Sequence, residues 1–384
     1  MGRLSANPQR FWSLDILRGV CSLTVFANHW VLWANFPPCG IWETALHKLL
    51  SDVYGIFVAL TWPTGGQHPA LVCFFVLSGF CVHYPFEGRK ACGESISWSR
   101  YFVRRAQRIL PVYWVGSLLG LLVVGAMHWR WVFDPLLILH SAVSPGQIAA
   151  RFGVFSGLWP KEVFVGNYIL NTVGVEVLIY ALYPLFFFLT SAGRWRLVGV
   201  AVVLMQITAL ALQPYFDPYV LFASVLVMGL FWYIGALVAH LHFRRRLNIR
   251  GWWIGGAWAL FLAVNMTPVF YGRNTIRQGI WAAVCALLVG WLVNWEARNQ
   301  EKRERPWSRV FQWFGGISYS LYAVHTPVIL LANWTCLTLL DSRDYRLQLA
   351  SSLVSSLVVT VVVHQFIERR FYRLPGATVA EARH

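Results

Sequence analysis

Residues 168–190 have the sequence YILNTVGVEVLIYALYPLFFFLT, which contains one charged side chain, Glu176. An α-helix needs about 20 predominantly apolar residues to cross the hydrocarbon core of a bilayer, so this stretch predicts a membrane-spanning helix. Nine other stretches meet or approach the same length. The ten predicted spans are 12–33, 70–86, 110–127, 168–190, 197–212, 219–241, 252–270, 276–295, 311–334 and 347–366. We therefore expect an all-α integral membrane protein with about ten transmembrane helices.

The composition of the whole chain agrees with a membrane location. Of its 384 residues 57% are hydrophobic and 12% charged, against about 25% charged in an average soluble domain. This balance excludes a disordered chain, a collagen-like fibre and a small disulfide scaffold. The formal net charge of +16 would suggest a nucleic-acid partner in a soluble protein, but so apolar a chain indicates membrane lipids around it and no nucleic acid.

The basic residues indicate how the chain is oriented. With the N-terminus in the cytoplasm, 23 Lys and Arg fall on the cytoplasmic side and 8 on the other. Because positive charge in short loops stays in the cytoplasm, we expect both termini there. Two short apolar segments, Val53–Trp62 and Trp131–His140, are predicted to be re-entrant or interfacial. Counting the first as a full crossing would move the six basic residues of 89–108 outside.

We expect residues 1–384 to form a single membrane domain, without a cleavable signal and without a fused extracytoplasmic hydrolase-like domain. The seven cysteines include no CxxC pair, so we expect neither a disulfide framework nor a metal site. Whether Cys39 and Cys336 pair in the outer compartment stays open. The oligomeric state also stays open.

The first span carries Arg18 and His29, two ionisable side chains at membrane depth. Such a charge costs at least about 2.5 kcal/mol, so it needs a reason. Eleven residues turn an α-helix by about three full turns, which places both side chains on one face about 16 Å apart. An anionic ligand near Arg18 with its reacting group near His29 fits this spacing, because neutral imidazole accepts protons near neutral pH. The structural alternative pairs Arg18 with Asp15.

A basic cluster opens the third span, where Arg104, Arg105 and Arg108 precede Pro111. Arg105 and Arg108 face the same way, at the predicted cytoplasmic end, where guanidinium groups can bind phosphates. Anchoring to lipid phosphate is an equally good interpretation.

Glu176 is an acid in the outer half of the fourth span with no neighbouring base in the sequence. It must therefore be neutral or paired with another helix, and His29 is one candidate partner. A structural polar clamp is the alternative.

The ninth span contains a polar stripe of Ser318, Tyr322 and His325 on an otherwise apolar helix. Such a stripe can line a wet cavity or join helices. The remaining polar residues of the spans are interpreted as packing or interface residues; they are Ser78, His83, His240, His242 and His364.

Taken together and in order, these segments resemble membrane acyltransferase family 3, the multi-pass O-acyltransferases of bacterial surface glycans. The segments that carry the resemblance are 13–19 with His29, Phe74–Phe80, Arg104–Tyr113, Val175–Glu176 with Tyr180 and Pro184, Ile317–Tyr322 with His325, and Ile367–Arg369. The resemblance covers nearly the whole chain.

The resemblance implies that His29 is catalytic and that Arg18 is its companion in an Arg-x10-His motif. It also implies that Arg105 and Arg108 form an RxxR pair linked to donor binding, with acetyl-CoA supplied from the cytoplasm as the donor. A bacterial cytoplasmic (inner) membrane is then the expected location. Ser78, within one of the motif segments, joins Ser318, Tyr322 and His325 as an expected substrate-lining residue.

The expected reaction transfers an acyl group, by default acetyl, to a hydroxyl of an extracytoplasmic glycan or glycolipid such as lipopolysaccharide O-antigen. His29 would act as general base or as a transient acyl carrier. Glu176 would orient it, and Ser318 or Tyr322 would bond the oxyanion. The alternative is a secondary transporter or flippase for an anionic lipid-linked sugar.

Overall fold

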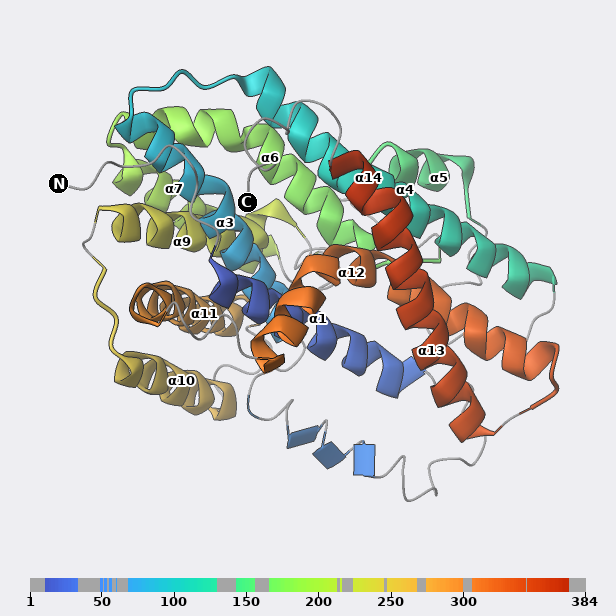
Figure 1. Cartoon of the computed structure of the whole chain (residues 1–384). Helices are drawn as coiled ribbons and strands as arrows, with labels where there is room; N and C mark the ends of the chain where they lie inside the picture. The colour runs from blue at the N-terminus through green and yellow to red at the C-terminus, as the bar shows by residue number, and fades with distance from the viewer. Residues whose placement is uncertain are drawn as a thin grey trace. The chain divides into compact units, whose positions relative to one another are not determined.

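Each of the ten predicted spans coincides with a helix of the computed structural model (Figure 1). The structure describes residues 11–33, 49–50, 52–53, 55–56, 60, 68–129, 143–155, 166–212, 215, 224–244, 247–267, 274–299, 306–342 and 344–372. Within them the longer helices are α1 (Trp12–Trp33), α3 (Pro69–Ala91), α4 (Trp98–Trp129), α6 (Leu170–Ser191), α7 (Trp195–Leu212), α9 (Val225–Phe243), α10 (Gly251–Met266), α11 (Asn274–Arg298), α12 (Pro306–Thr338) and α13 (Tyr345–Val363). The described residues form no strand, so the all-α prediction is confirmed.

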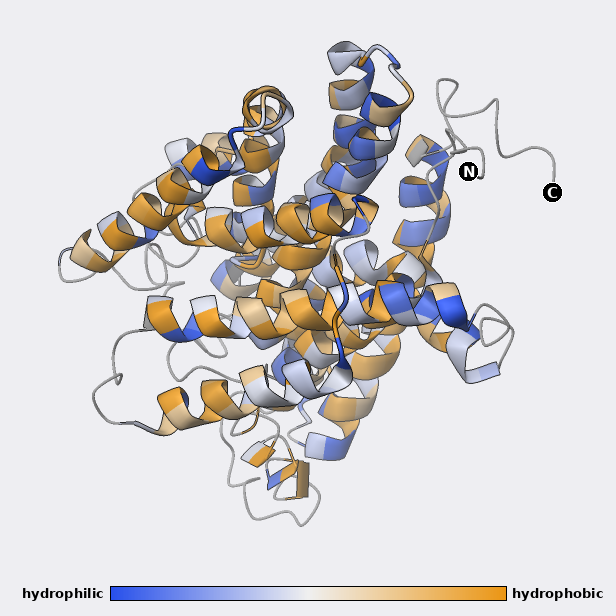
Figure 2. Cartoon of the chain, turned by 90° about the vertical axis from the view of Figure 1, so that its left-hand side faces the viewer, coloured by the Kyte–Doolittle hydropathy of each residue, from blue (hydrophilic) through white to orange (hydrophobic). Residues whose placement is uncertain are grey.

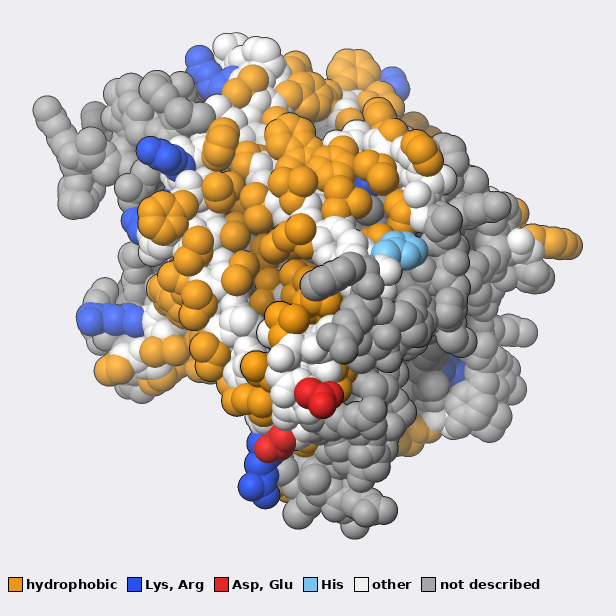
Figure 3. All heavy atoms as spheres, turned by 90° about the vertical axis from the view of Figure 1, so that its right-hand side faces the viewer, with side chains coloured by type: hydrophobic (Ala, Val, Ile, Leu, Met, Phe, Trp, Pro, Cys, Tyr) orange, Lys and Arg blue, Asp and Glu red, His pale blue; other side chains and the backbone are white. Residues whose placement is uncertain are grey.

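Eight of the described helices are long and apolar enough to cross a membrane. Hydrophobic residues run along most of the length of most helices (Figure 2), and they cover broad areas of the face drawn in Figure 3. Helices α1 and α10 fall outside the eight: α1 carries Asp15 and Arg18, and α10 has only 16 residues. The chain is therefore a multi-pass membrane protein, while ten spans with both termini inside stay a prediction.

Three short helical elements were not expected. Helix α5 (Pro145–Phe152) begins at a capping box formed by Ser144 and Gln147. After α13, the π-helix η5 (His364–Glu368) and the single turn α14 (Arg369–Tyr372) continue the last span. Of the two predicted re-entrant segments, Trp131–His140 lies outside the described residues. Only scattered positions of Val53–Trp62 are described.

The helices divide into two compact units, which are treated separately below. The first unit comprises Met1–Cys21, Val58–Trp98 and Ala181–Gly316. The second unit comprises Ser22–Phe57, Ser99–Tyr180 and Ile317–His384. Helices α1, α6 and α12 contribute residues to both, and α4 contributes its first residue, Trp98, to the first unit and the rest to the second.

In the first unit, α3 packs most extensively against α9. The packing depends on two glycines, because a Cβ at Gly79 would lie 2.0 Å from the carbonyl oxygen of Trp232 and one at Gly235 would lie 2.0 Å from that of Val76. Small residues let membrane helices approach this closely. The glycine of the Phe74–Phe80 motif is thus explained by helix packing.

Gly79→Ala is expected to lower the free energy of unfolding of the purified protein by about 1–3 kcal/mol, because the backbone must move to accept the methyl group. Gly125→Ala is the matched control, since nothing lies within 4 Å of a Cβ at that position of α4. Thermal unfolding in one detergent measures both. Equal stability of the two variants would contradict the close packing of α3 on α9.

The N-terminus of α1 is capped within the first unit by a side chain from α11. Glu296 accepts hydrogen bonds from the backbone N–H groups of Trp12 and Ser13, at 3.1 and 2.9 Å, and from the Ser13 hydroxyl at 2.6 Å. A carboxylate satisfies the unpaired N–H groups of a helix start and suits its dipole. Ser13 of the first motif segment therefore fixes where α1 begins.

The core of the second unit surrounds the C-terminal half of α1. Its buried side chains come from α1, α4 and α12; they are Phe26, Val123, Val124, Met127, Leu321, Ile329, Leu330 and Trp334. Asn167 also links elements here, because its side-chain amide donates to the carbonyl oxygens of Gly116 and Ala323 at 3.1 and 2.9 Å. His29 and His325 are held in this core.

Candidate active site

His29 lies in the second unit, one turn after Phe26 on α1, and is 8% exposed. The Phe26 ring packs edge-on against the ring of His325, with 6.0 Å between centroids. His325 is fully buried on α12. The two imidazoles stack with centroids 5.1 Å apart, and His29 Nδ1 lies 2.8 Å from His325 Nε2. The structure thus brings together two residues that the sequence singled out separately.

The hydrogen bonds of this pair determine which nitrogen is basic. His325 Nδ1 lies 2.7 Å from the carbonyl oxygen of Leu321, which can only accept, so Nδ1 carries the hydrogen. In the neutral ring Nε2 then accepts, and His29 Nδ1 must donate to it. The lone pair of His29 is therefore at Nε2, where a proton acceptor for chemistry is needed.

His29 Nε2 faces the hydroxyl of Tyr168, 3.2 Å away. Because Nε2 has the lone pair, Tyr168 is the donor in this bond. The Tyr168 ring also packs edge-on against the imidazole, with 6.3 Å between centroids. A hydroxyl oxygen is thus already at hydrogen-bonding distance from the nitrogen that would accept a proton from a substrate hydroxyl.

Tyr168, in the turn just before α6, begins a line of polar side chains spaced four residues apart that continues along the helix. We call Tyr168, Thr172, Glu176 and Tyr180 the polar row; all four belong to the second unit. Residues four apart on a helix lie on the same face, so Thr172, Glu176 and Tyr180 share one face of α6 over about 12 Å. The polar row therefore starts in the turn at Tyr168 and continues along one face of the helix in a largely apolar segment.

Each member after Tyr168 has a described partner. Thr172 Oγ1 lies 2.6 Å from the Tyr322 hydroxyl and donates to the Ile169 carbonyl at 2.8 Å. The Tyr322 hydroxyl also lies 3.3 Å from the Ile169 carbonyl, so either hydroxyl can be the donor in the short contact. Further along, Glu176 accepts a hydrogen bond from the hydroxyl of Tyr180.

The far end of the polar row reaches Arg105 on α4. Its guanidinium carbon lies 4.9 Å from the ring centroid of Tyr180 and 5.7 Å from that of Tyr101. The Tyr101 hydroxyl in turn donates to the Tyr180 carbonyl at 3.2 Å. Cations over tyrosine faces are stabilised by about 0.5–1 kcal/mol or more, so two rings hold the Arg105 side chain in place.

The other arginines of this cluster differ from Arg105 in their surroundings. Arg104 and Arg108 are exposed, whereas Arg105 is half-buried. The end of the polar row therefore combines one held guanidinium with two exposed ones nearby on the same helix, a combination suited to phosphate groups.

Two further motif segments of the second unit contact each other. Glu368 in η5 accepts from the Ser320 hydroxyl at 2.6 Å and is paired with His364 Nδ1 at 2.8 Å. The Tyr319 hydroxyl donates to the carbonyl oxygen of Ile109 at 2.9 Å. These bonds fix α12 beside α4 and the end of the last span, which explains the two motif segments structurally.

Arg18 lies in the first unit, on the N-terminal part of α1. It forms the predicted structural pair with Asp15, with Nη1 2.8 Å from Oδ1, and its Nη2 lies 2.8 Å from Cys81 Sγ. Helix α1 is continuous through His29, as the shared-face prediction requires. The part of α1 that carries His29 belongs to the second unit.

The remaining predicted site residues divide between the two units. Ser318, buried on α12, belongs to the second unit with Tyr322, whereas Ser78 belongs to the first unit on α3. The described bonds give His29 the partners His325 and Tyr168, and they give Glu176 the partner Tyr180. A direct Glu176–His29 pair stays a prediction. Cys39 lies outside the described residues, so its pairing with Cys336 also stays a prediction.

Sequence reasoning missed Tyr168 and Thr172 as site residues. Their spacing of four from Glu176 is a signal that was present in the sequence. The contact between His29 and His325, 296 positions apart, had no signal in a single sequence.

Comparisons with known proteins agree with the motifs. A family model described as "Acyltransferase domain" matches residues 11–365. The exopolysaccharide production protein ExoZ of Rhizobium meliloti (strain 1021) is 28% identical over 172 residues, which cover 42% of this chain and 50% of that relative. No solved structure matches.

Proposed function

Because this chain belongs to the acyltransferase family whose model covers residues 11–365, we propose that it transfers an acyl group from acyl-CoA to a glycan hydroxyl. The observation that carries the proposal is the placement of the two ends of the polar row within the second unit: Tyr168 contacts His29, and Tyr180 contacts Arg105. A base at one end and a held cation at the other match a substrate with a reactive thioester and a distant phosphorylated part.

His29 is proposed as the general base. The acceptor hydroxyl would replace Tyr168 at Nε2 and give its proton to that nitrogen as its oxygen bonds to the thioester carbonyl carbon. The carbonyl oxygen then takes up the negative charge. When this intermediate collapses, the carbon–sulfur bond breaks and the departing thiolate takes the proton from His29.

His325 and Tyr168 are proposed to assist His29. His325 keeps the lone pair at Nε2 by accepting the Nδ1 hydrogen, and it stabilises the imidazolium that forms during the reaction. Tyr168, displaced by the acceptor, would turn its hydroxyl toward the developing oxyanion and donate to it. Tyr322 is less suited to that task, because its hydroxyl already contacts the Thr172 hydroxyl and the Ile169 carbonyl. Glu176 accepts a hydrogen bond from Tyr180 at the arginine end, and its role in orienting His29 stays a prediction.

Acetyl-CoA is proposed as the donor, delivered from the cytoplasm. The predicted positive-inside orientation supports this, because it would put Arg104, Arg105 and Arg108 on the cytoplasmic side, where CoA is available. Arg18 is kept as a candidate for an anionic part of the donor. The pantetheine arm of CoA is narrow and carries amides, so the polar row offers it hydroxyl and carboxylate partners in an otherwise apolar segment.

The acceptor is proposed to be an extracytoplasmic polysaccharide or a lipid-linked precursor of one. The partial similarity to an exopolysaccharide production protein supports this class. Lipopolysaccharide O-antigen is one member of it. The proposed location is the bacterial cytoplasmic (inner) membrane.

Mass spectrometry of surface glycans tests the proposal. Cells expressing the chain are expected to carry an added acyl mass on a glycan that is absent from cells without it and from cells expressing His29→Ala. If cells with and without the chain carry glycans of equal acyl content and differ only in the amount of glycan at the surface, acyl transfer is contradicted and a transporter for the sugar is indicated.

Arg105→Ala is expected to raise the dissociation constant for acetyl-CoA about 10-fold or more, since charge-assisted bonds to phosphate contribute about 1.5–3 kcal/mol. Arg104→Ala, an exposed neighbour on α4, is the comparison variant and should change affinity less. Calorimetric titration of the purified variants gives both values. Unchanged donor affinity in Arg105→Ala would remove this residue from the donor site.

A further inference from the structure

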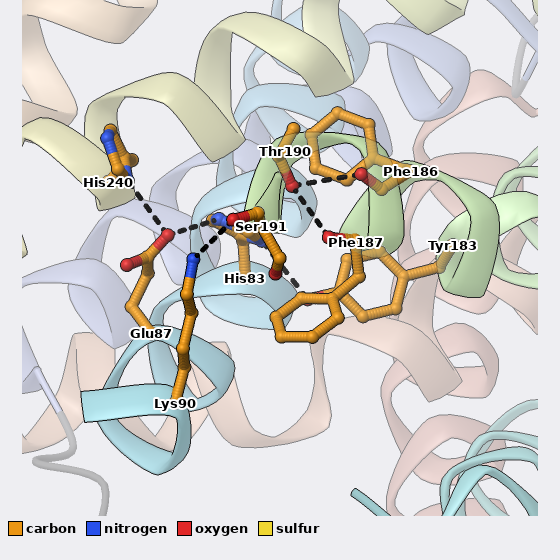
Figure 4. Close-up of polar contacts among 9 residues, drawn as sticks. All are labelled: His83, Glu87, Lys90, Tyr183, Phe186, Phe187, Thr190, Ser191 and His240. Carbon is orange, nitrogen blue, oxygen red and sulfur yellow. Dashed lines mark hydrogen bonds and ion pairs between the residues drawn. The ribbon is translucent and has the colours of Figure 1, made fainter. Parts of the chain in front are cut away.

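Three potential ligand side chains converge in the first unit, apart from the proposed active site. His83 and Glu87 lie one turn apart on α3, and His240 lies on α9 (Figure 4). Glu87 Oε1 is 3.0 Å from His83 Nε2 and 2.8 Å from His240 Nδ1. All three ligand atoms lie within 4.8 Å of one another.

The cluster is buried, and this burial requires a positive partner for the carboxylate. His83 is 0% and Glu87 5% exposed, within helices that span the membrane. An ionised carboxylate removed from water costs several kcal/mol unless a cation or several donors compensate. The carboxylate is compensated by N–H groups of the two histidines, by a proton that charges one of them, or by a metal ion among the three ligands.

The surroundings of His83 suit a metal ligand. Its second nitrogen, Nδ1, lies 3.1 Å from the Tyr183 hydroxyl. That oxygen can accept Nδ1–H, and in this tautomer the Nε2 lone pair is directed toward the cluster, as metal binding requires. Metal-ligating histidines almost always have such an outer partner, which fixes the tautomer and the ring orientation.

Aromatic rings form the wall of the cluster. His240 packs against Trp195 with centroids 4.5 Å apart, and His83 packs edge-on against Trp195 and Phe186 at 5.3 and 5.5 Å. Lys90 on α3 is directed to another partner, because its Nζ donates to the Ser191 carbonyl at 3.1 Å (Figure 4). The rings limit the access of water, and a low-dielectric wall strengthens charge–ligand bonds.

We propose that His83, Glu87 and His240 bind one zinc ion that joins α3 to α9. Two imidazole nitrogens and one carboxylate oxygen are the ligand set of known zinc sites, and Ca²⁺ and Mg²⁺ prefer all-oxygen sites. Ligand atoms of a tetrahedral zinc site lie about 3.3 Å apart, close to the two observed distances. Small outward movements of the side chains therefore make room for the ion. This revises the sequence-based expectation that the chain holds no metal.

Zinc content and zinc affinity test the proposal on the full-length purified protein. After removal of metal with a chelator, the wild-type chain is expected to take up one Zn²⁺, measured by mass spectrometry of the metal and by competition with a chromophoric chelator. His240→Ala should lower the affinity for Zn²⁺ by about 100-fold or more. Replacing only the hydrogen-bond partner of a metal-binding histidine already costs about 10- to 100-fold in affinity, and the loss of a ligand should cost at least as much. Tyr183→Phe should lose about 10-fold.

His242→Ala is the matched control. His242 lies two residues further on α9 and contacts Asn294 Oδ1 at 3.2 Å instead of the cluster, so its replacement should leave zinc binding unchanged. His240→Gln is the second variant if alanine impairs folding, with thermal unfolding as the check. The proposal is overturned if the stripped wild-type chain takes up no zinc, or if His240 and His242 variants bind it equally.

Discussion

His29→Ala is expected to lower acetyl-CoA turnover by the purified protein by about 100- to 10,000-fold, the usual contribution of a general base. The acceptor hydroxyl would keep its proton, and no other described imidazole would replace Nε2 beside Tyr168. Release of the CoA thiol in the presence of acceptor polysaccharide measures the rate. Donor affinity should change little, because Arg105 lies at the other end of the polar row.

Folding must be separated from chemistry in this experiment. His29→Ala leaves the Nε2 acceptor of buried His325 without its donor. This should lower the free energy of unfolding by about 1–3 kcal/mol. His29→Gln keeps an N–H donor for that acceptor but provides no base, so it should be as inactive as His29→Ala and more stable. His128→Ala, at an exposed histidine of α4, should behave as wild type. Normal turnover by His29→Gln would contradict the role of His29.

His325→Leu has the second largest expected effect, a loss of about 10- to 1,000-fold in turnover. Leucine removes the acceptor of the His29 Nδ1 hydrogen, so the imidazole can turn or exchange tautomers and Nε2 is no longer kept basic. In a known serine protease triad, loss of tautomer control lowers the rate by about 10,000-fold, which marks the upper limit of such an effect. His325 is thus a positioning residue.

The pH dependence of the rate distinguishes positioning from simple structural damage. The acidic limb of turnover reports the base in the enzyme–substrate complex, so His325→Leu should move its midpoint. His325→Gln offers an amide oxygen to the same hydrogen and should recover much of the rate. A lower rate with an unchanged pH profile, and no recovery with glutamine, would mean that His325 only supports packing.

The helices could be predicted largely from hydropathy, but their ends could not. Helix α4 begins at Trp98, well before the predicted span, since Arg100 to Arg108 reduce the hydropathy without interrupting the helix. Helix α12 likewise begins at Pro306, a residue suited to the first turn. Helix α5 was missed because its eight residues are too few for a membrane pattern.

Individual residues of the candidate site could be predicted from the sequence, but the contacts between them could not. Buried ionisable residues are costly, so His29, Arg18 and Glu176 stand out in any membrane sequence. Their partners depend on tertiary packing: His325 on a distant helix orients His29, and Glu296 caps α1 from α11. The polar row is the exception, because its period of four is local.

Transfer of a labelled acetyl group across a membrane most directly tests whether His29 catalyses acyl transfer. Proteoliposomes with the cytoplasmic face inward would contain acetyl-CoA labelled in the acetyl group, with de-acylated surface polysaccharide outside. Labelled polysaccharide is expected outside with wild-type protein and not with His29→Gln. Equal labelling by both proteins, or none by a wild-type chain that binds acetyl-CoA, would contradict acyl transfer through His29.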